Sequence, residues 1–95
     1  MRVDKQIIQF FKQRIVERKP DARVYLFGSR TSDDSLGGDI DILILSDNLI
    51  EKRIIRSIRI DFYQKFGWQK IDLVNFTFTD ESVFKQLILT NAIEL

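Results

Sequence analysis

Short apolar runs that alternate with helical repeats constrain the fold of this 95-residue chain most. Residues 23–27, 39–45 and 69–76 are short and rich in β-branched and aromatic side chains, which is typical of strands. The first run stops at Gly28, and the second begins after Gly37 and Gly38, where turns are favoured. The sequence therefore predicts three strands.

Apolar residues recur at helical spacing in the segments between and around these runs. Three segments show this repeat: residues 4–18, 49–66 and 80–90. Pro20 prevents continuation of the first helix, Gly67 is a suitable C-terminal cap for the second, and Thr79 is a suitable N-cap for the third. The expected order is helix, strand, strand, helix, strand, helix. This order predicts a mixed α/β (α+β) domain, in which a small mixed sheet of three or more strands packs with helices.

Size and charge limit the classes of function. Ninety-five residues allow one hydrophobic core, so we expect residues 1–95 to form a single domain. Fifteen basic and 14 acidic residues give a net charge of +1, which argues against direct nucleic-acid binding and against an anionic membrane surface. The sequence has no Cys and no apolar run long enough for a membrane span or a signal peptide. We therefore expect a cytoplasmic protein that does not bind membranes.

The absence of two residue types restricts the chemistry further. Without Cys, thiol catalysis and thiolate metal sites are excluded. Without His, the commonest general base and the usual zinc ligand are missing. Metal chemistry in this chain would depend on carboxylate oxygens, which suit Mg²⁺ or Mn²⁺.

Three aspartates are the candidate metal ligands. Asp39 and Asp41 are two residues apart on a predicted strand, so their side chains should point to the same face about 7 Å apart. Two such charges next to isoleucines repel one another, and divalent cations remove that repulsion. Asp72 interrupts the apolar run Ile71–Leu73–Val74, where the local pattern does not require a charge. If its strand lies beside the second one, the three carboxylates converge.

Gly28 and Ser29 are candidates for phosphate binding. A glycine lets the backbone approach a phosphate, while amides and the Ser29 hydroxyl can donate to its oxygens. Arg30 adds a possible forked contact with phosphate. Each signal alone is weak, because Gly-Ser and Asp-Ile-Asp are common at turns and strand starts. The combination is more specific: a strand, Gly-Ser, nine further residues, Asp-x-Asp on a second strand and a lone Asp on a third.

The stretch LFGSRTSDDSLGGDIDILI resembles the signature of the DNA polymerase beta-type nucleotidyltransferase superfamily, and most closely its minimal, prokaryotic, antitoxin-like branch. The later QKIDLVNF resembles the strand of that branch that carries the third carboxylate. The resemblance covers residues 24–76 and implies the polymerase beta palm-like fold. One departure is that many relatives have ten residues between the serine and the first aspartate, often with a basic loop, whereas this loop is shorter and partly acidic.

The resemblance also implies roles for single residues. Gly28 and Ser29 would bind nucleotide phosphates. Asp39 and Asp41 would bind two ions of Mg²⁺ or Mn²⁺, and Asp72 would ligate the catalytic ion and help activate the attacking hydroxyl. The expected reaction is transfer of a nucleotidyl group, AMP from ATP in the first instance, to a hydroxyl acceptor.

The acceptor must come from elsewhere, because the sequence contains no obvious domain to bind it. A second protein or a second subunit of a homo-oligomer could supply it. Minimal nucleotidyltransferases of the resembled branch are often antitoxins that modify a tyrosine of a HEPN-type ribonuclease toxin, so the resemblance implies a small helical HEPN-type partner. Two other readings stay open: a non-catalytic module that neutralises or assembles with a partner, and nucleotidyl transfer to a small molecule.

Other residues are weaker candidates. Asp33 and Asp34 could reach a metal, but their neighbours Thr31, Ser32 and Ser35 favour a turn. Lys52, Arg56 and Arg59 share one helical face that could bind RNA, a nucleotide or an acidic partner, although a solvated face is the simpler interpretation. Tyr63 and Trp68 could stack on a base, but packing at the core or its edge is commoner for aromatic residues near a helix end.

Overall fold

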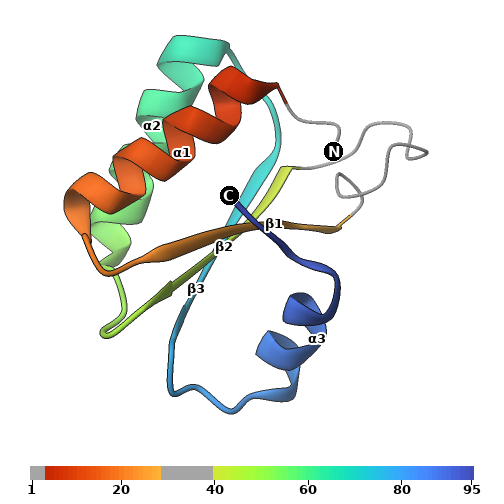
Figure 1. The fold of residues 1–95 in the computed structure, drawn as a ribbon. Coiled ribbons are helices and arrows are strands. Elements are labelled where there is room, and N and C mark those ends of the chain that lie inside the picture. Colours follow the sequence, from red (N-terminus) through yellow and green to blue (C-terminus); the bar gives the residue numbers. More distant parts are fainter. Residues whose placement is uncertain (1–3, 29–39) are drawn as a thin grey trace.

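A computed structural model describes residues 4–28 and 40–95. The elements are α1 (Lys5–Arg18), β1 (Arg23–Phe27), β2 (Ile40–Ser46), α2 (Lys52–Phe66), β3 (Ile71–Thr77), α3 (Val83–Asn91) and β4 (Ile93–Glu94). The strands form one sheet in the order β3-β2-β1-β4, in which β2 and β3 are parallel and the other pairs are antiparallel. Helices α1 and α2 lie on one face of the sheet and α3 lies on the other (Figure 1). The predicted mixed α/β fold is confirmed.

Side-chain alternation along the strands divides the core into two clusters. Ile40, Ile42 and Ile44 of β2 face α1 and α2, where they join a cluster that includes Phe11 and Phe62. The rings of these two phenylalanines stack with centroids 5.1 Å apart. The alternate residues of β2 face the other way, where Leu43 and Leu45 pack with Ile88 of α3 in a second cluster. Asp41 therefore belongs to the α3 side of the sheet.

The first helix and the strands agree closely with the sequence prediction, but α2 begins later than expected. Asp4 caps α1, since its side chain accepts a hydrogen bond of 2.7 Å from the Gln6 amide. The repeat at residues 49–66 predicted a helix from Leu49, whereas α2 starts at Lys52. Ile50 is buried and its amide bonds to a side chain of β3, so this segment is held against the sheet instead of joining the helix.

The C-terminal part differs from the prediction in two ways. Thr79 is not the N-cap of α3; Ser82 is, and its hydroxyl accepts a hydrogen bond of 3.2 Å from the Lys85 amide. Asp80 accepts from the Ser82 amide at 2.7 Å, which lowers the pKa of the Asp80 carboxyl. Buried Lys85 donates from Nζ to the carbonyl oxygens of Thr77, Phe78 and Asp80 at 3.1, 2.8 and 2.9 Å. These bonds order residues 77–82 as a turn, so the helix starts later.

The second difference is β4, which the sequence analysis did not predict. It has only two residues and pairs with Tyr25 and Leu26 of β1. An ion pair of 3.0 Å between Arg23 and Glu94 supports this pairing. A run this short carries no detectable alternation, so its partner strand decides its conformation.

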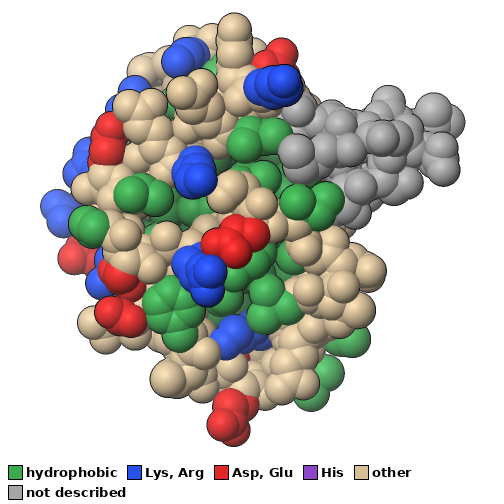
Figure 2. Space-filling model, viewed as in Figure 1, with side chains coloured by type: hydrophobic (Ala, Val, Ile, Leu, Met, Phe, Trp, Pro, Cys, Tyr) green, Lys and Arg blue, Asp and Glu red, His purple; other side chains and the backbone are tan. Residues whose placement is uncertain are grey.

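The surface carries charges of both signs. Lys and Arg side chains are interspersed with Asp and Glu on the face drawn in Figure 2. Tyr63 packs against the first core cluster as predicted, but Trp68 is 79% exposed, so the prediction that it packs is wrong. Trp68 directly follows Gly67, the C-cap residue at which α2 ends. None of the helices within residues 4–28 and 40–95 has the length and apolarity needed to cross a bilayer.

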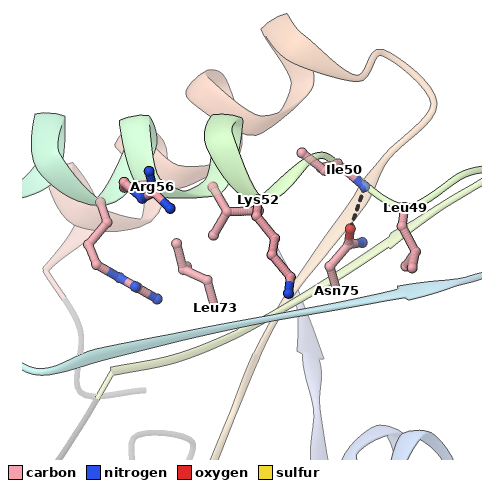
Figure 3. Close-up of a pocket in the computed structure, with 8 residues that line it drawn as sticks. Leu49, Ile50, Lys52, Arg56, Leu73 and Asn75 are labelled. Atoms are coloured by element: carbon pink, nitrogen blue, oxygen red, sulfur yellow. Dashed lines mark hydrogen bonds between the residues drawn. The ribbon is translucent and has the colours of Figure 1, made fainter.

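Asn75 joins β3 to the segment before α2. Its Oδ1 accepts a hydrogen bond of 2.6 Å from the Ile50 amide (Figure 3). Its Nδ2 donates to the Ile44 carbonyl at 3.1 Å and has a longer contact of 3.4 Å with the Ser46 hydroxyl. The half-buried side chain of Asn75 thus forms hydrogen bonds with β2 and with the segment before α2.

Replacing Asn75 with Ala should lower the free energy of unfolding by about 2 to 4 kcal/mol, because the Ile50 amide and the Ile44 carbonyl lose their partner. Urea denaturation followed by circular dichroism would measure the change. Asn48→Ala is the matched control, because Asn48 is exposed, and its cost should stay within about 0.5 kcal/mol. Equal losses in the two variants would contradict the role assigned to Asn75.

Candidate active site

Two of the predicted carboxylates lie on neighbouring strands. Asp41 of β2 and Asp72 of β3 are direct partners in the parallel register. Partner residues point to the same face, and neighbouring strands lie about 4.8 Å apart, so both side chains project on the α3 side of the sheet. Asp41 is half-buried and Asp72 is exposed. The predicted approach of the third-strand carboxylate to the second strand is observed.

Gly28 lies against Asp41. The last residue of β1, Phe27, is the register partner of Asp41, and Gly28 follows with φ +80°. A Cβ at position 28 would overlap Oδ2 of Asp41 and lie 3.1 Å from its Cγ. Glycine is therefore required here for two reasons: its backbone conformation is strained for other residues, and its missing side chain leaves room for the carboxylate.

The remaining predicted residues lie outside the part of the chain that the structure describes. These are Ser29, Arg30 and Asp39, and also Asp33 and Asp34. Among the described residues, no group of three acidic, His or Cys side chains is arranged to hold a metal ion. The described part of the candidate site consists of Gly28, Asp41 and Asp72.

The described donors suit a hard divalent cation. Two carboxylates on adjacent strands offer several oxygen atoms on one face, and Mg²⁺ and Mn²⁺ prefer oxygen ligands. Gly28 keeps a side chain out of the space next to Asp41. A cation bound between the carboxylates would balance the repulsion between these two like charges.

A cavity of about 500 Å³ opens beside Gly28. Its lining combines β1 with α3 and β4: Phe27, Gly28, Leu87, Ile88, Asn91 and Ile93. The sequence analysis missed Leu87, Asn91 and Ile93, because their contribution depends on how the C-terminal segment folds back onto β1. Since Gly28 also lies against Asp41, the cavity opens next to that carboxylate on the α3 side of the sheet.

The fold is similar to several solved structures at low sequence identity. A chain in the crystal structure of a mutant of the toxin–antitoxin pair MntA–HpeT superimposes with a TM-score of 0.71 and 22% identity, over 98% of this chain and 72% of that one. A chain in the structure of the tri-AMPylated Shewanella oneidensis HEPN toxin in complex with MNT antitoxin gives 0.63 and 22%, over 94% and 65%. Another Shewanella oneidensis structure gives 0.63 and 19%, over 97% and 71%. These similarities establish the fold.

Sequence comparison identifies the family. No curated protein sequence matches this chain. The model of the family described as nucleotidyltransferase domain matches residues 5–94, which is nearly the whole chain. The match spans Gly28 and both register-paired aspartates, and it confirms the resemblance seen in the sequence. The chain belongs to the nucleotidyltransferase domain family.

Proposed function

We propose that this protein transfers AMP from ATP to a hydroxyl group of a partner protein, with two bound ions of Mg²⁺ or Mn²⁺. The observation that carries the proposal is the pairing of Asp41 with Asp72 beside Gly28. Two carboxylates on one sheet face offer oxygen ligands for ions about 3.5 to 4 Å apart, the spacing of a two-metal site. Membership of the nucleotidyltransferase family gives the reaction class.

In the proposed reaction, the acceptor hydroxyl oxygen attacks the α-phosphorus and forms a new P–O bond. The bond between the α-phosphorus and the bridging oxygen breaks, pyrophosphate leaves, and the hydroxyl proton passes toward Asp72. Bound metal ions would supply positive charge to the attacking and leaving oxygens. Asp41 and Asp72 would position these ions, and Asp39 would complete the ligand set.

The nucleotide would lie along the α3 side of the sheet. Gly28 and Ser29 would bind its phosphates, with Arg30 as an additional contact. The cavity beside Gly28 has room for the nucleoside, with an apolar wall from Leu87 and polar groups from Asn91. Since the same glycine contacts Asp41, the phosphates would reach the carboxylates directly from this cavity.

One of the similar structures supports a class of partner. One of them contains a tri-AMPylated HEPN toxin in complex with MNT antitoxin. We infer that this chain likewise modifies a small helical HEPN-type protein and acts as its antitoxin in the cytoplasm, with residues 1–95 working as one domain. The modified hydroxyl would then be supplied by that partner.

One observation favours a second candidate function, a binding module that neutralises its partner without chemistry. Val83, Phe84 and Leu87 of α3 are 70%, 56% and 65% exposed, although all three are large and apolar. Exposed apolar groups of this kind are common where a protein partner docks. Both functions use a partner, so only a measurement of transfer separates them.

The affinity of this protein for a nucleotide should depend on a divalent metal ion. Calorimetry with a non-hydrolysable ATP analogue should detect binding in Mg²⁺ or Mn²⁺ and at least about tenfold weaker binding in EDTA, because the triphosphate and the carboxylates repel without a cation. The Asp72→Asn variant should bind the analogue more weakly in Mg²⁺. Equal affinity with and without EDTA would exclude the metal-dependent proposal.

A further inference from the structure

A second cavity lies on the opposite side of the sheet from the paired aspartates. It measures about 410 Å³ and opens between α2 and β3 (Figure 3). Its floor is apolar and includes Ile50, Ile55 and Leu73. Leu73 belongs to the face of β3 that packs against the first core cluster, whereas its neighbour Asp72 points to the other face. We name this cavity the α2–β3 groove.

Three basic side chains line the groove, and none of its lining residues is an Asp or a Glu. Lys52, Arg56 and Arg59 are spaced over two turns of α2, and the Lys52 side chain reaches toward the strand below (Figure 3). The ion pairs of the described residues involve other basic groups, such as Arg53 with Glu51 and Arg14 with Asp61. The groove therefore has a local positive charge on a chain whose net charge is only +1.

The strand under the groove is at the edge of the sheet. Within residues 4–28 and 40–95, β3 pairs with β2 alone, over seven register positions. Its residues are more exposed than those of β2, five of them being half-buried and Asp72 exposed. An edge strand presents backbone N–H and C=O groups that can pair with an added strand.

The spacing of the cations fits an extended acidic segment. Lys52 and Arg56 are four residues apart on α2, which is about 6 Å along the helix axis. Acidic side chains at alternate positions of a strand are about 7 Å apart and point to the same side. A strand added to β3 could therefore place alternate carboxylates toward these cations and the apolar floor.

We propose that the α2–β3 groove binds an extended, acidic segment of a partner protein, which adds to the sheet beside β3. Nucleic acid fits less well, because the eight lining residues include no aromatic side chain on which a base could stack. The inference goes beyond the proposed function: it places a docking site on the side of the sheet away from Asp41 and Asp72. It requires neither nucleotide nor metal.

Fluorescence anisotropy with a labelled peptide of alternating Glu and Val, in EDTA and without ATP, tests this proposal. The protein should bind this peptide and should not bind a matched peptide of alternating Lys and Val. The variant with Arg56→Glu and Arg59→Glu should lose affinity by about tenfold or more, and the variant with two Gln replacements should lose less. Arg53→Glu is the matched control on the same helix, with the same change of charge per residue and an expected change below about twofold.

Two further probes define the mode of binding. N-methylation of alternate residues of the acidic peptide removes the N–H donors that strand pairing uses, so it should reduce affinity by at least about tenfold. Equal affinity of the wild type and the groove variants, both folded by circular dichroism, would overturn the proposal. Stronger binding of a single-stranded ribo-oligonucleotide than of the peptide, lost in the groove variants, would assign the groove to nucleic acid instead. Because these assays contain no ATP or metal, their failure is independent of any failure of the transferase proposal.

Discussion

Replacement of Asp41 with Asn should reduce nucleotidyl transfer by roughly 1,000-fold or more, since the carboxylate would lose its charge at the position where a cation must be held. The fold should persist or become slightly more stable, because Asp41 and Asp72 are register partners and the substitution removes repulsion between like charges. A labelled-nucleotide transfer assay beside a thermal melt would measure both quantities.

Asp47→Asn is the control for this experiment. Asp47 directly follows β2, is exposed, and differs from Asp41 in lying at the other end of the strand. The control removes the same charge and should retain the activity of the wild type. Full activity of the Asp41→Asn protein would place the metal site elsewhere.

The Gly28→Ala variant should lose nucleotidyl transfer by about 100-fold, the cost of misplacing reacting groups by a small distance. A methyl group at position 28 would occupy the space of the Asp41 carboxylate, which must then move from its present position. The free energy of unfolding should also fall by about 1 to 3 kcal/mol, because φ +80° is unfavourable for alanine. Transfer assays and urea denaturation measure the two effects.

Gly67→Ala separates backbone strain from the effect on the site. Gly67 has φ +82°, nearly the same as Gly28, but a Cβ at this position meets nothing within 4 Å. The Gly67→Ala protein should therefore lose about 1 to 3 kcal/mol of stability and keep its transfer activity. If both alanine variants lose activity to the same extent, overall destabilisation explains the loss and the specific role of Gly28 is refuted.

The sequence predicted those features that depend on local patterns. The helical repeat placed α1, and the short run rich in β-branched and aromatic residues placed β1, within a residue or two, and Gly67 ends α2 as expected. Asp72 was singled out because a charge in an apolar strand has no local structural reason, and its role in the site stays a prediction. Its pairing with Asp41 then required only that the two strands be neighbours.

Features that depend on tertiary contacts were not predicted. The start of α2 is decided by the bond from Ile50 to Asn75, which lies on a strand 25 residues further along the chain. The start of α3 is decided by Lys85, whose ammonium group bonds to three carbonyls. Neither contact leaves a periodic signal in the sequence. The cavity beside Gly28 also depends on such contacts, since α3 and β4 must fold back onto β1.

Intact-mass spectrometry of the partner distinguishes the proposed covalent modification from neutralisation by binding alone. A HEPN-type protein that forms a complex with this one would be incubated with ATP, Mg²⁺ and either the wild type or the Asp72→Asn variant. The proposal predicts that the partner's mass rises by one or more AMP groups with the wild type and stays unchanged with the variant. If the partner is neutralised equally well by both proteins with no change in mass, neutralisation works by binding alone and the proposed transferase function is contradicted.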